Sequence, residues 1–170
     1  ITAFGRKTDQ PLSIVVVLDM SISQERVIPL AKQVSLRFVD LATHPGKDSI
    51  GIISFTDGAK FEQELTSDLQ QARRAIERLE FSPPPGYIRG VGAVVTPPIP
   101  GQNQKTAGST AIWDTISFAS EKFGAQTSDN PRRVIILFTD GNDTSSKNKL
   151  TKAVEAAIKS GVVVYSIGIG

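Results

Sequence analysis

Short apolar runs alternate with amphipathic segments along most of the chain. Runs rich in β-branched residues predict strands buried on both faces, at residues 13–19, 49–55, 134–138 and 162–169. Apolar residues at helical spacing predict helices between and after them, with the stripes Val27, Ala31, Val34, Phe38 and Leu41; Leu69, Ala72, Ile76 and Leu79; Ile112, Ile116, Ala119 and Phe123; and Leu150, Val154, Ala157 and Ile158. This alternation predicts an α/β fold with a mostly parallel sheet and helices on both faces.

One predicted strand departs from the parallel pattern. The triplet Thr56-Asp57-Gly58 is a hairpin turn signal, and apolar and charged residues alternate only partly over residues 60–65. We therefore expect an antiparallel edge strand, whose charges discourage pairing with further strands. The following Ser67-Asp68-Leu69-Gln70 matches a capping box, which predicts the start of a helix.

A proline- and glycine-rich insertion occupies residues 82–107 and holds six of the ten prolines of the chain. We expect a long loop with a small hairpin around Val91 to Thr96, because long structureless loops in compact domains are commonly functional. The insertion ends directly before the candidate site residue Thr110. Its predicted role is part of a partner-binding rim, and the equal alternative is a tolerated surface insertion of small entropic cost.

Length and composition limit the classes of protein to consider. A chain of 170 residues predicts one domain, spanning residues 1–170. The net charge of +2 comes from interspersed acidic and basic residues, which gives no basic stripe for nucleic acid. The apolar strands are too short for direct membrane insertion, and the absence of cysteine excludes disulfides and thiolate zinc sites. Because the chain starts at Ile1, we expect a piece of a longer protein.

Candidate chemistry stands where the predicted strands end. The first strand breaks into the alternating oxygen side chains of Asp19, Ser21 and Ser23, Thr110 precedes a helix, and Asp140 follows a later strand. In open α/β sheets, ligands bind beyond the carboxyl ends of the strands. Hard divalent cations prefer oxygen ligands, and Mg²⁺ retains several waters. The sequence therefore predicts a metal site at the carboxyl edge of the sheet.

Three motifs in this order, D-x-S-x-S, G-S-T and T-D-G, resemble the metal-ion-dependent adhesion site of von Willebrand factor type A domains, especially bacterial ones. The resemblance implies a doubly wound, Rossmann-like sheet and a site for Mg²⁺ or Mn²⁺, with Ca²⁺ as a further candidate. Ser21 and Ser23 would ligate the cation directly, Thr110 directly or through water, and Asp19 and Asp140 would neutralise it directly or through water. An open position would accept an Asp or Glu carboxylate of a partner protein. An extracytoplasmic or cell-surface setting is also implied.

The chain departs from the family pattern in two respects. Many members have Gly where this chain has Ile22, and Met where it has Gln24. We expect Ile22 to place an apolar side chain beside the metal. The family also continues past residue 170 with another strand and helix, so we expect these to be missing, leaving a sheet edge or an apolar face in need of a partner.

Other residues have competing interpretations. Asp19 and its serines could simply cap a loop and helix. Of the two Thr-Asp-Gly triplets, the one with Asp57 is followed at once by an alternating strand and is interpreted as a turn, so we assign Asp140 to the site. Asp143 and Asn142 are interpreted as turn and cap residues, and Asp114 either supports a metal ligand or faces solvent.

The predicted function is cation-dependent protein binding, with adhesion or assembly as its purpose, and no catalysis. Neither a nucleophile-elbow motif nor a general base stands out. One alternative is a metal-dependent phosphoryl-transfer enzyme of the haloacid-dehalogenase type, but that class requires a second Asp where this chain has Ser21. The other is an assembly module that makes contacts through its loops and leaves its metal site unused. The oligomeric state stays open.

Overall fold

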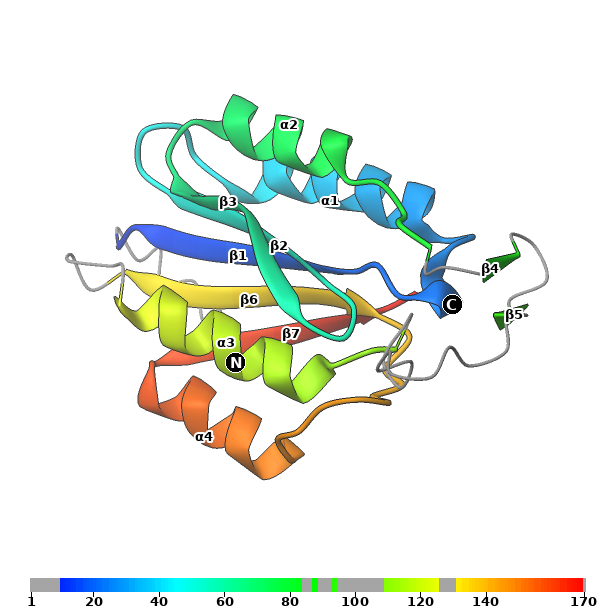
Figure 1. Ribbon diagram of the computed structural model, residues 1–170. Helices are drawn as coiled ribbons and strands as arrows, with labels where there is room; N and C mark the ends of the chain where they lie inside the picture. Colours follow the sequence, from blue (N-terminus) through cyan, green and yellow to red (C-terminus); the bar gives the residue numbers. More distant parts are fainter. Residues whose placement is uncertain (1–9, 84–86, 89–92, 95–108, 126–130, 170) are drawn as a thin grey trace, which may run out of the picture.

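The computed structural model describes residues 10–83, 87–88, 93–94, 109–125 and 131–169. A five-stranded sheet has the order β3-β2-β1-β6-β7, with the strands β1 (Leu12–Asp19), β2 (Ser49–Phe55), β3 (Ala59–Thr66), β6 (Arg132–Thr139) and β7 (Val162–Gly168). One face carries α1 (Ile28–Ala42) and α2 (Leu69–Arg78), and the other carries α3 (Ile112–Ala125) and α4 (Leu150–Lys159) (Figure 1). The predicted doubly wound α/β architecture is confirmed.

Strand pairing brings the carboxyl ends of β1 and β6 together. β1 pairs in parallel with both β2 and β6, with Asp19 opposite Phe55 and Leu18 opposite Phe138. β7 continues the parallel sheet beyond β6. β3 is the one antiparallel strand of this sheet among the described residues, as predicted, and it pairs with β2. The carboxyl ends of β1 and β6 therefore lie side by side at one end of the sheet, where the loops that follow them can meet.

β1 explains why its sequence is almost wholly apolar. Ile14, Val16 and Leu18 belong to the core beneath α1 and α2. Val15 and Val17 belong to the core beneath α3 and α4. Because side chains alternate across a strand, both faces of β1 are buried and both need apolar residues.

The prediction of which face α1 buries is wrong in part. Its buried positions are Ile28, Ala31, Ser35 and Val39, whereas Leu41 is 82% exposed and Val34 is also exposed. The helix carries apolar residues on two adjacent stripes, so periodicity alone could not select the buried one.

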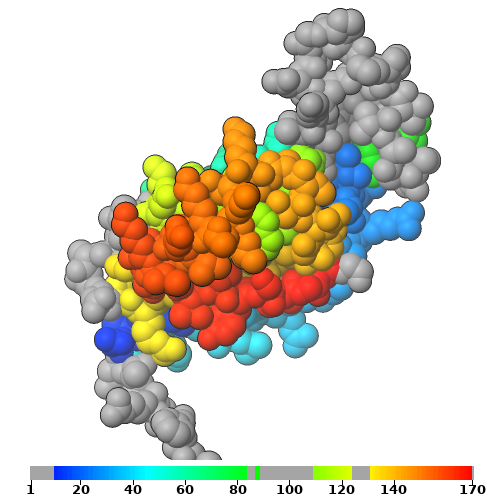
Figure 2. Space-filling view, turned by 90° about the horizontal axis from the view of Figure 1, so that it is seen from below, coloured from blue at the N-terminus to red at the C-terminus, as the bar shows by residue number. Residues whose placement is uncertain are grey.

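The buried stripe predicted for α4 is wrong at most of its positions. Ala153 and Ala157 are the buried residues, while Leu150, Val154 and Ile158 are exposed, Ile158 by 74%. The alanines allow close packing of α4 on α3 and the sheet, which turns the larger side chains outward. Figure 2 shows α4 and β7 at the surface of the molecule.

β7 supplies the sheet edge that the sequence predicted. Within the described part of the chain, β7 pairs with β6 alone. Val163 and Tyr165 project from β7 and are exposed.

Two local predictions need adjustment. The residue that caps α2 is Asp68, not Ser67, because its carboxylate accepts the backbone N–H groups of Gln70 and Gln71. In the insertion, β4 (Tyr87–Ile88) pairs antiparallel with β5 (Ala93–Val94). The predicted hairpin around residues 91–96 thus includes β5 but begins too late for β4. Residues 84–86, 89–92 and 95–108 of the insertion lie outside the described residues.

None of the helices in the described ranges is long and apolar enough to cross a membrane.

Candidate metal centre

Asp19, the last residue of β1, is fixed by hydrogen bonds from two segments. Its Oδ1 accepts the backbone N–H of Ser21 at 3.0 Å. Its Oδ2 accepts the hydroxyl of Thr139, the last residue of β6, at 2.6 Å. Only 3% of Asp19 is exposed. Strand pairing and these bonds hold one carboxylate beneath the loop that follows β1.

The two predicted serines face each other above Asp19. Their Oγ atoms lie 3.1 Å apart. Ser21 precedes the short 3₁₀ helix η1 (Ile22–Gln24), and its carbonyl accepts the N–H of Gln24 at 3.0 Å. A single turn of 3₁₀ helix therefore converts an alternating D-x-S-x-S pattern into a cluster of side-chain oxygens.

Asp140 reaches the same cluster from the loop after β6. Its Oδ1 accepts the N–H of Asn142 at 3.0 Å, in a turn where Gly141 has a φ of +84°. Although partial burial opposes the change, hydrogen bonding from the Ser23 hydroxyl and the Asn142 N–H lowers the pKa of Asp140. Ser23 thus connects the two loops.

The environment of Asp19 disfavours its negative charge. Burial raises the pKa of Asp19, and the nearby charge of Asp140 raises it further, against the opposing hydrogen bonds from Thr139 and Ser21. Neither carboxylate forms an ion pair with a basic side chain in the described ranges. Two carboxylates and two hydroxyls with an unfavourable buried negative charge form a donor set that fits a hard divalent cation.

Thr110 belongs to a third loop at the same edge. Its N–H donates to Thr144 Oγ1 at 2.9 Å, and its carbonyl accepts the N–H groups of Thr144 and Ser145. The N–H of the next residue, Ala111, donates to the carbonyl of Thr56 in the β2–β3 turn. Thr110 is buried and pinned between two loops.

The turn and cap interpretations of Asp57 and Asp143 are confirmed. Asp57 accepts the hydroxyl of Thr56 within the β2–β3 turn. Asp143 Oδ1 accepts the N–H of Ile112 at 2.7 Å, at the start of α3. Asp143 therefore stabilises the helix that follows Thr110, and the predicted role as a cap is a supporting one for the site.

Asp114 is half-buried and binds a neighbouring loop. Its carboxylate accepts the N–H groups of Lys147 and Asn148, each at 2.9 Å. It therefore organises the loop between β6 and α4. Sequence reasoning also missed Thr139, whose hydroxyl bonds Asp19 and accepts the N–H of Gly141 at 3.2 Å. Its position directly before Asp140 at a strand end was the available signal.

Within the described ranges, no group of three or more His, Cys, Asp or Glu side chains is placed to hold a metal ion. The cluster of Asp19, Ser21, Ser23 and Asp140 is not of that type, because serine hydroxyls supply two of its oxygen donors. A cavity of about 140 Å³ opens beside it, lined in part by Trp113, Thr139 and Asp140.

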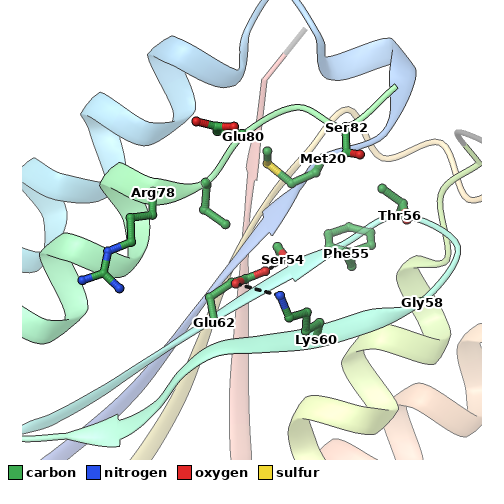
Figure 3. A pocket seen from close by; sticks show the side chains of 11 residues that line it. Met20, Ser54, Phe55, Thr56, Gly58, Lys60, Glu62, Arg78, Glu80 and Ser82 are labelled. Atoms are coloured by element: carbon green, nitrogen blue, oxygen red, sulfur yellow. Dashed lines mark hydrogen bonds and ion pairs between the residues drawn. The ribbon is translucent and has the colours of Figure 1, made fainter. Parts of the chain in front are cut away.

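A second pocket, of about 330 Å³, lies on the other side of Met20, against the β2–β3 hairpin and the end of α2 (Figure 3). Its carboxylate Glu62 accepts the Ser54 hydroxyl at 2.6 Å and Lys60 Nζ at 3.2 Å. Glu62 is therefore already engaged by neighbours within the hairpin.

Comparison with solved structures identifies proteins of similar fold. The conserved hypothetical protein BatB from Bacteroides thetaiotaomicron is 24% identical, with a TM-score of 0.66 over 94% of this chain and 67% of that chain. Proximal thread matrix protein 1 from the mussel byssus, with a zinc-occupied MIDAS motif, is 20% identical, with a TM-score of 0.69 over 95% of this chain and 39% of that chain. A von Willebrand factor type A protein from Catenulispora acidiphila is 20% identical, with a TM-score of 0.69 over 95% of this chain and 34% of that chain.

Identities this low establish the fold alone. No curated protein sequence matches the chain. The family model of the von Willebrand factor type A domain, however, matches residues 14–142, which include most of β1, all of β6 and the loops that carry the oxygen cluster. The chain therefore belongs to the von Willebrand factor type A domain family.

Proposed function

We propose that this domain binds a partner protein through a divalent cation, Mg²⁺ or Mn²⁺, with Ca²⁺ as a further candidate. The observation that carries the proposal is the buried Asp19 carboxylate. It is held in place by Thr139 and Ser21, yet it faces a second carboxylate, Asp140, without a basic partner in the described ranges. A bound dication would remove this electrostatic cost.

The chain's own residues have distinct parts in this proposal. Ser21 and Ser23 would bind the cation through their hydroxyls, which already face each other at 3.1 Å. Thr110 would bind directly or through water, and Asp19 and Asp140 would neutralise the charge directly or through water. The cation supplies a positive centre that attracts an additional oxygen ligand.

The partner in this proposal presents an Asp or Glu side chain. Two carboxylates and neutral hydroxyls leave a hard cation short of oxygen ligands, so an incoming carboxylate supplies both an oxygen and a charge. Trp113, beside the cavity near Asp140, is placed to form part of the surrounding surface. The adhesive character of the site would thus depend on the cation.

Part of the insertion supports its proposed role as a rim. The Tyr87 hydroxyl donates to Glu25 Oε2 at 2.5 Å, and its ring packs edge-on against Phe81 at a centroid distance of 5.6 Å. Glu25 directly follows η1, so these contacts fasten β4 beside the loop that carries Ser21 and Ser23. Figure 1 shows β4 and β5 near the carboxyl end of β1.

The relatives favour an extracytoplasmic or cell-surface setting as a proposal. One similar structure, 23% identical with a TM-score of 0.67, is an aerotolerance-related membrane protein from Bacteroides fragilis. Von Willebrand factor type A domains generally mediate protein interactions, which is the class of function that the family supports.

The metal-dependent phosphatase remains the alternative from another class. Its mechanism requires a second carboxylate at the position of Ser21 to act as general acid. Hydrolysis of a generic aryl phosphate with Mg²⁺, abolished by Asp19→Asn, would establish that alternative. The third possibility, an assembly module without a working metal site, predicts partner binding that is indifferent to chelation.

Calorimetric titration with Mg²⁺ and Mn²⁺ tests the proposal. We expect saturable binding by the natural chain and none by the Asp19→Ala/Asp140→Ala variant. Asp57→Ala is the matched control, because it removes the carboxylate of the other Thr-Asp-Gly triplet, and it should bind normally. Equal loss in the control would contradict the assignment of Asp140. Absence of binding by the natural chain would favour the loop-mediated assembly module.

A further inference from the structure

Gln24 is a buried polar residue in the wall of the proposed metal centre. It is the last residue of η1 and directly follows Ser23, and only 3% of it is exposed. Its backbone is fully engaged: the N–H donates to Ser21 at 3.0 Å, and the carbonyl accepts the N–H of Val27 at 2.9 Å. The side chain is thus rooted on the same turn that presents the serine hydroxyls.

The side-chain amide of Gln24 lacks a hydrogen-bond acceptor. Its Nε2 is buried and makes no hydrogen bond. A buried N–H group without an acceptor is unfavourable, whereas an apolar side chain of similar length, such as Met, would avoid the cost. Packing alone therefore does not explain why a side-chain amide occupies this position.

The surroundings indicate the missing acceptor. The side chains of Gln24 and Ser23 both lie close enough to the carboxyl of Asp140 to lower its pKa. Asp140 Oδ1 already accepts the N–H of Asn142. The Asp140 carboxylate is therefore the acceptor that the surroundings offer to Gln24, although no hydrogen bond of ordinary geometry joins Nε2 to it in this structure.

We propose that Gln24 is a positioning residue for the cation: its Nε2–H group donates to the Asp140 carboxylate when the cation is bound. This inference rests on the proposed function. The hydrogen bond would fix the orientation of Asp140, as donors behind a metal ligand commonly do. A hydrogen bond to Asp140 would satisfy the buried amide, so its formation together with cation binding would add to the affinity for the cation.

Two substitutions test the role of Gln24 by Mg²⁺ calorimetry and thermal unfolding. Gln24→Met removes the amide and keeps the length, so we expect a Kd for Mg²⁺ about tenfold higher. The Tm without cation should be unchanged or higher, because a buried unpaired N–H group is removed. A lower Tm with unchanged Kd would overturn the proposal and make Gln24 a structural residue.

Gln24→Glu separates donation from direct ligation. If the amide donates to Asp140, a third carboxylate in its place repels Asp140 and weakens Mg²⁺ binding at neutral pH. Tighter binding by Gln24→Glu would overturn the proposal, because it would mean that the carbonyl oxygen of Gln24 ligates the cation itself.

The side-chain amide can also be followed directly by NMR. The ¹H–¹⁵N pair of signals that is absent from Gln24→Met identifies the amide in the natural chain. We expect one of its protons to shift downfield as Mg²⁺ is added, and an unmoved pair would overturn the proposal. If the natural chain binds no cation at all, the proposed function falls and this inference with it. If the natural chain and Gln24→Met bind equally, only the role of Gln24 falls.

Discussion

Asp19 and Asp48 are equally buried, at 3% exposure each, but they lie at opposite ends of the parallel sheet. Asp19 ends β1, whereas Asp48 directly precedes β2. Burial raises the pKa of Asp19, with a further contribution from Asp140. At Asp48, burial acts in the same direction but is outweighed, because N–H groups of Leu12 and His44 lower the pKa of that carboxyl.

The difference lies in what faces each carboxylate. Asp48 accepts the Leu12 N–H at 2.8 Å and the His44 N–H at 2.8 Å, and these two hydrogen bonds stabilise its negative charge. It fastens the start of β1 to the loop before β2. Asp19 also accepts two hydrogen bonds, from Ser21 and Thr139, but burial outweighs them, and the charge of Asp140 adds a smaller effect in the same direction. A buried carboxylate is therefore a structural fastening at one end of this sheet and a candidate cation ligand at the other.

The largest expected effect is that of Asp48→Asn. Oδ2 of Asp48 accepts the His44 N–H and Oδ1 accepts the Leu12 N–H, so either orientation of the new amide sets its NH₂ group against a backbone donor. We expect the free energy of unfolding to fall by about 2 kcal/mol. Urea denaturation with unchanged m-value measures it. A neutral result would mean that Asp48 is not a fastening.

Asp19→Asn should have the opposite sign in the cation-free protein. The amide keeps the acceptor for Ser21 and can donate to the Thr139 oxygen, while it removes a buried charge that faces Asp140. We expect a gain of about 1 kcal/mol in the free energy of unfolding without cation. The stabilisation by added Mg²⁺ should be lost at the same time. Destabilisation without cation would contradict the electrostatic contrast with Asp48.

The parallel strands of the sheet could be predicted because each is a short run rich in β-branched residues. The sequence also singled out Asp19, Ser21, Ser23 and Asp140, which the structure brings together, since oxygen side chains at strand ends are an unusual interruption of an apolar run. Its failures have a common physical origin. Leu41 and Ile158 are apolar but exposed, because which stripe of a helix is buried depends on the shape of the neighbouring surface. Asp48 acts through Leu12, a partner distant in the chain, which no local pattern reveals.

Asp19 and Asp48 should contribute to the pH dependence of folding stability in opposite directions, which can be measured in the natural chain without a substitution. The raised pKa of Asp19 gives stability that is fully present below its unfolded value near 3.8 and is lost as the pH rises through its folded value. The lowered pKa of Asp48 gives stability that is present above 3.8 and is lost as the pH falls through its folded value.

Cation-free protein should therefore become more stable on mild acidification and then lose stability at lower pH. Asp19→Asn should remove the rise and keep the later fall. Saturating Mg²⁺ should also suppress the rise, because the cation and the proton compete for the same carboxylates. A rise that survives in Asp19→Asn would assign it to another group. Chemical denaturation at a series of pH values measures both limbs.

The smallest expected effect is that of His44→Ala. The His44 ring contacts Asp48 Oδ2 through Nδ1 at 3.1 Å, but its side chain is 80% exposed to solvent, which screens the interaction. The backbone N–H groups of Leu12 and His44 are unaffected by the substitution. We therefore expect a loss of only a few tenths of a kcal/mol in the free energy of unfolding, measured by urea denaturation beside Asp48→Asn. If His44→Ala were as damaging as Asp48→Asn, the fastening would depend on the imidazole, and the contrast between backbone donors at Asp48 and an uncompensated carboxylate at Asp19 would have to be redrawn.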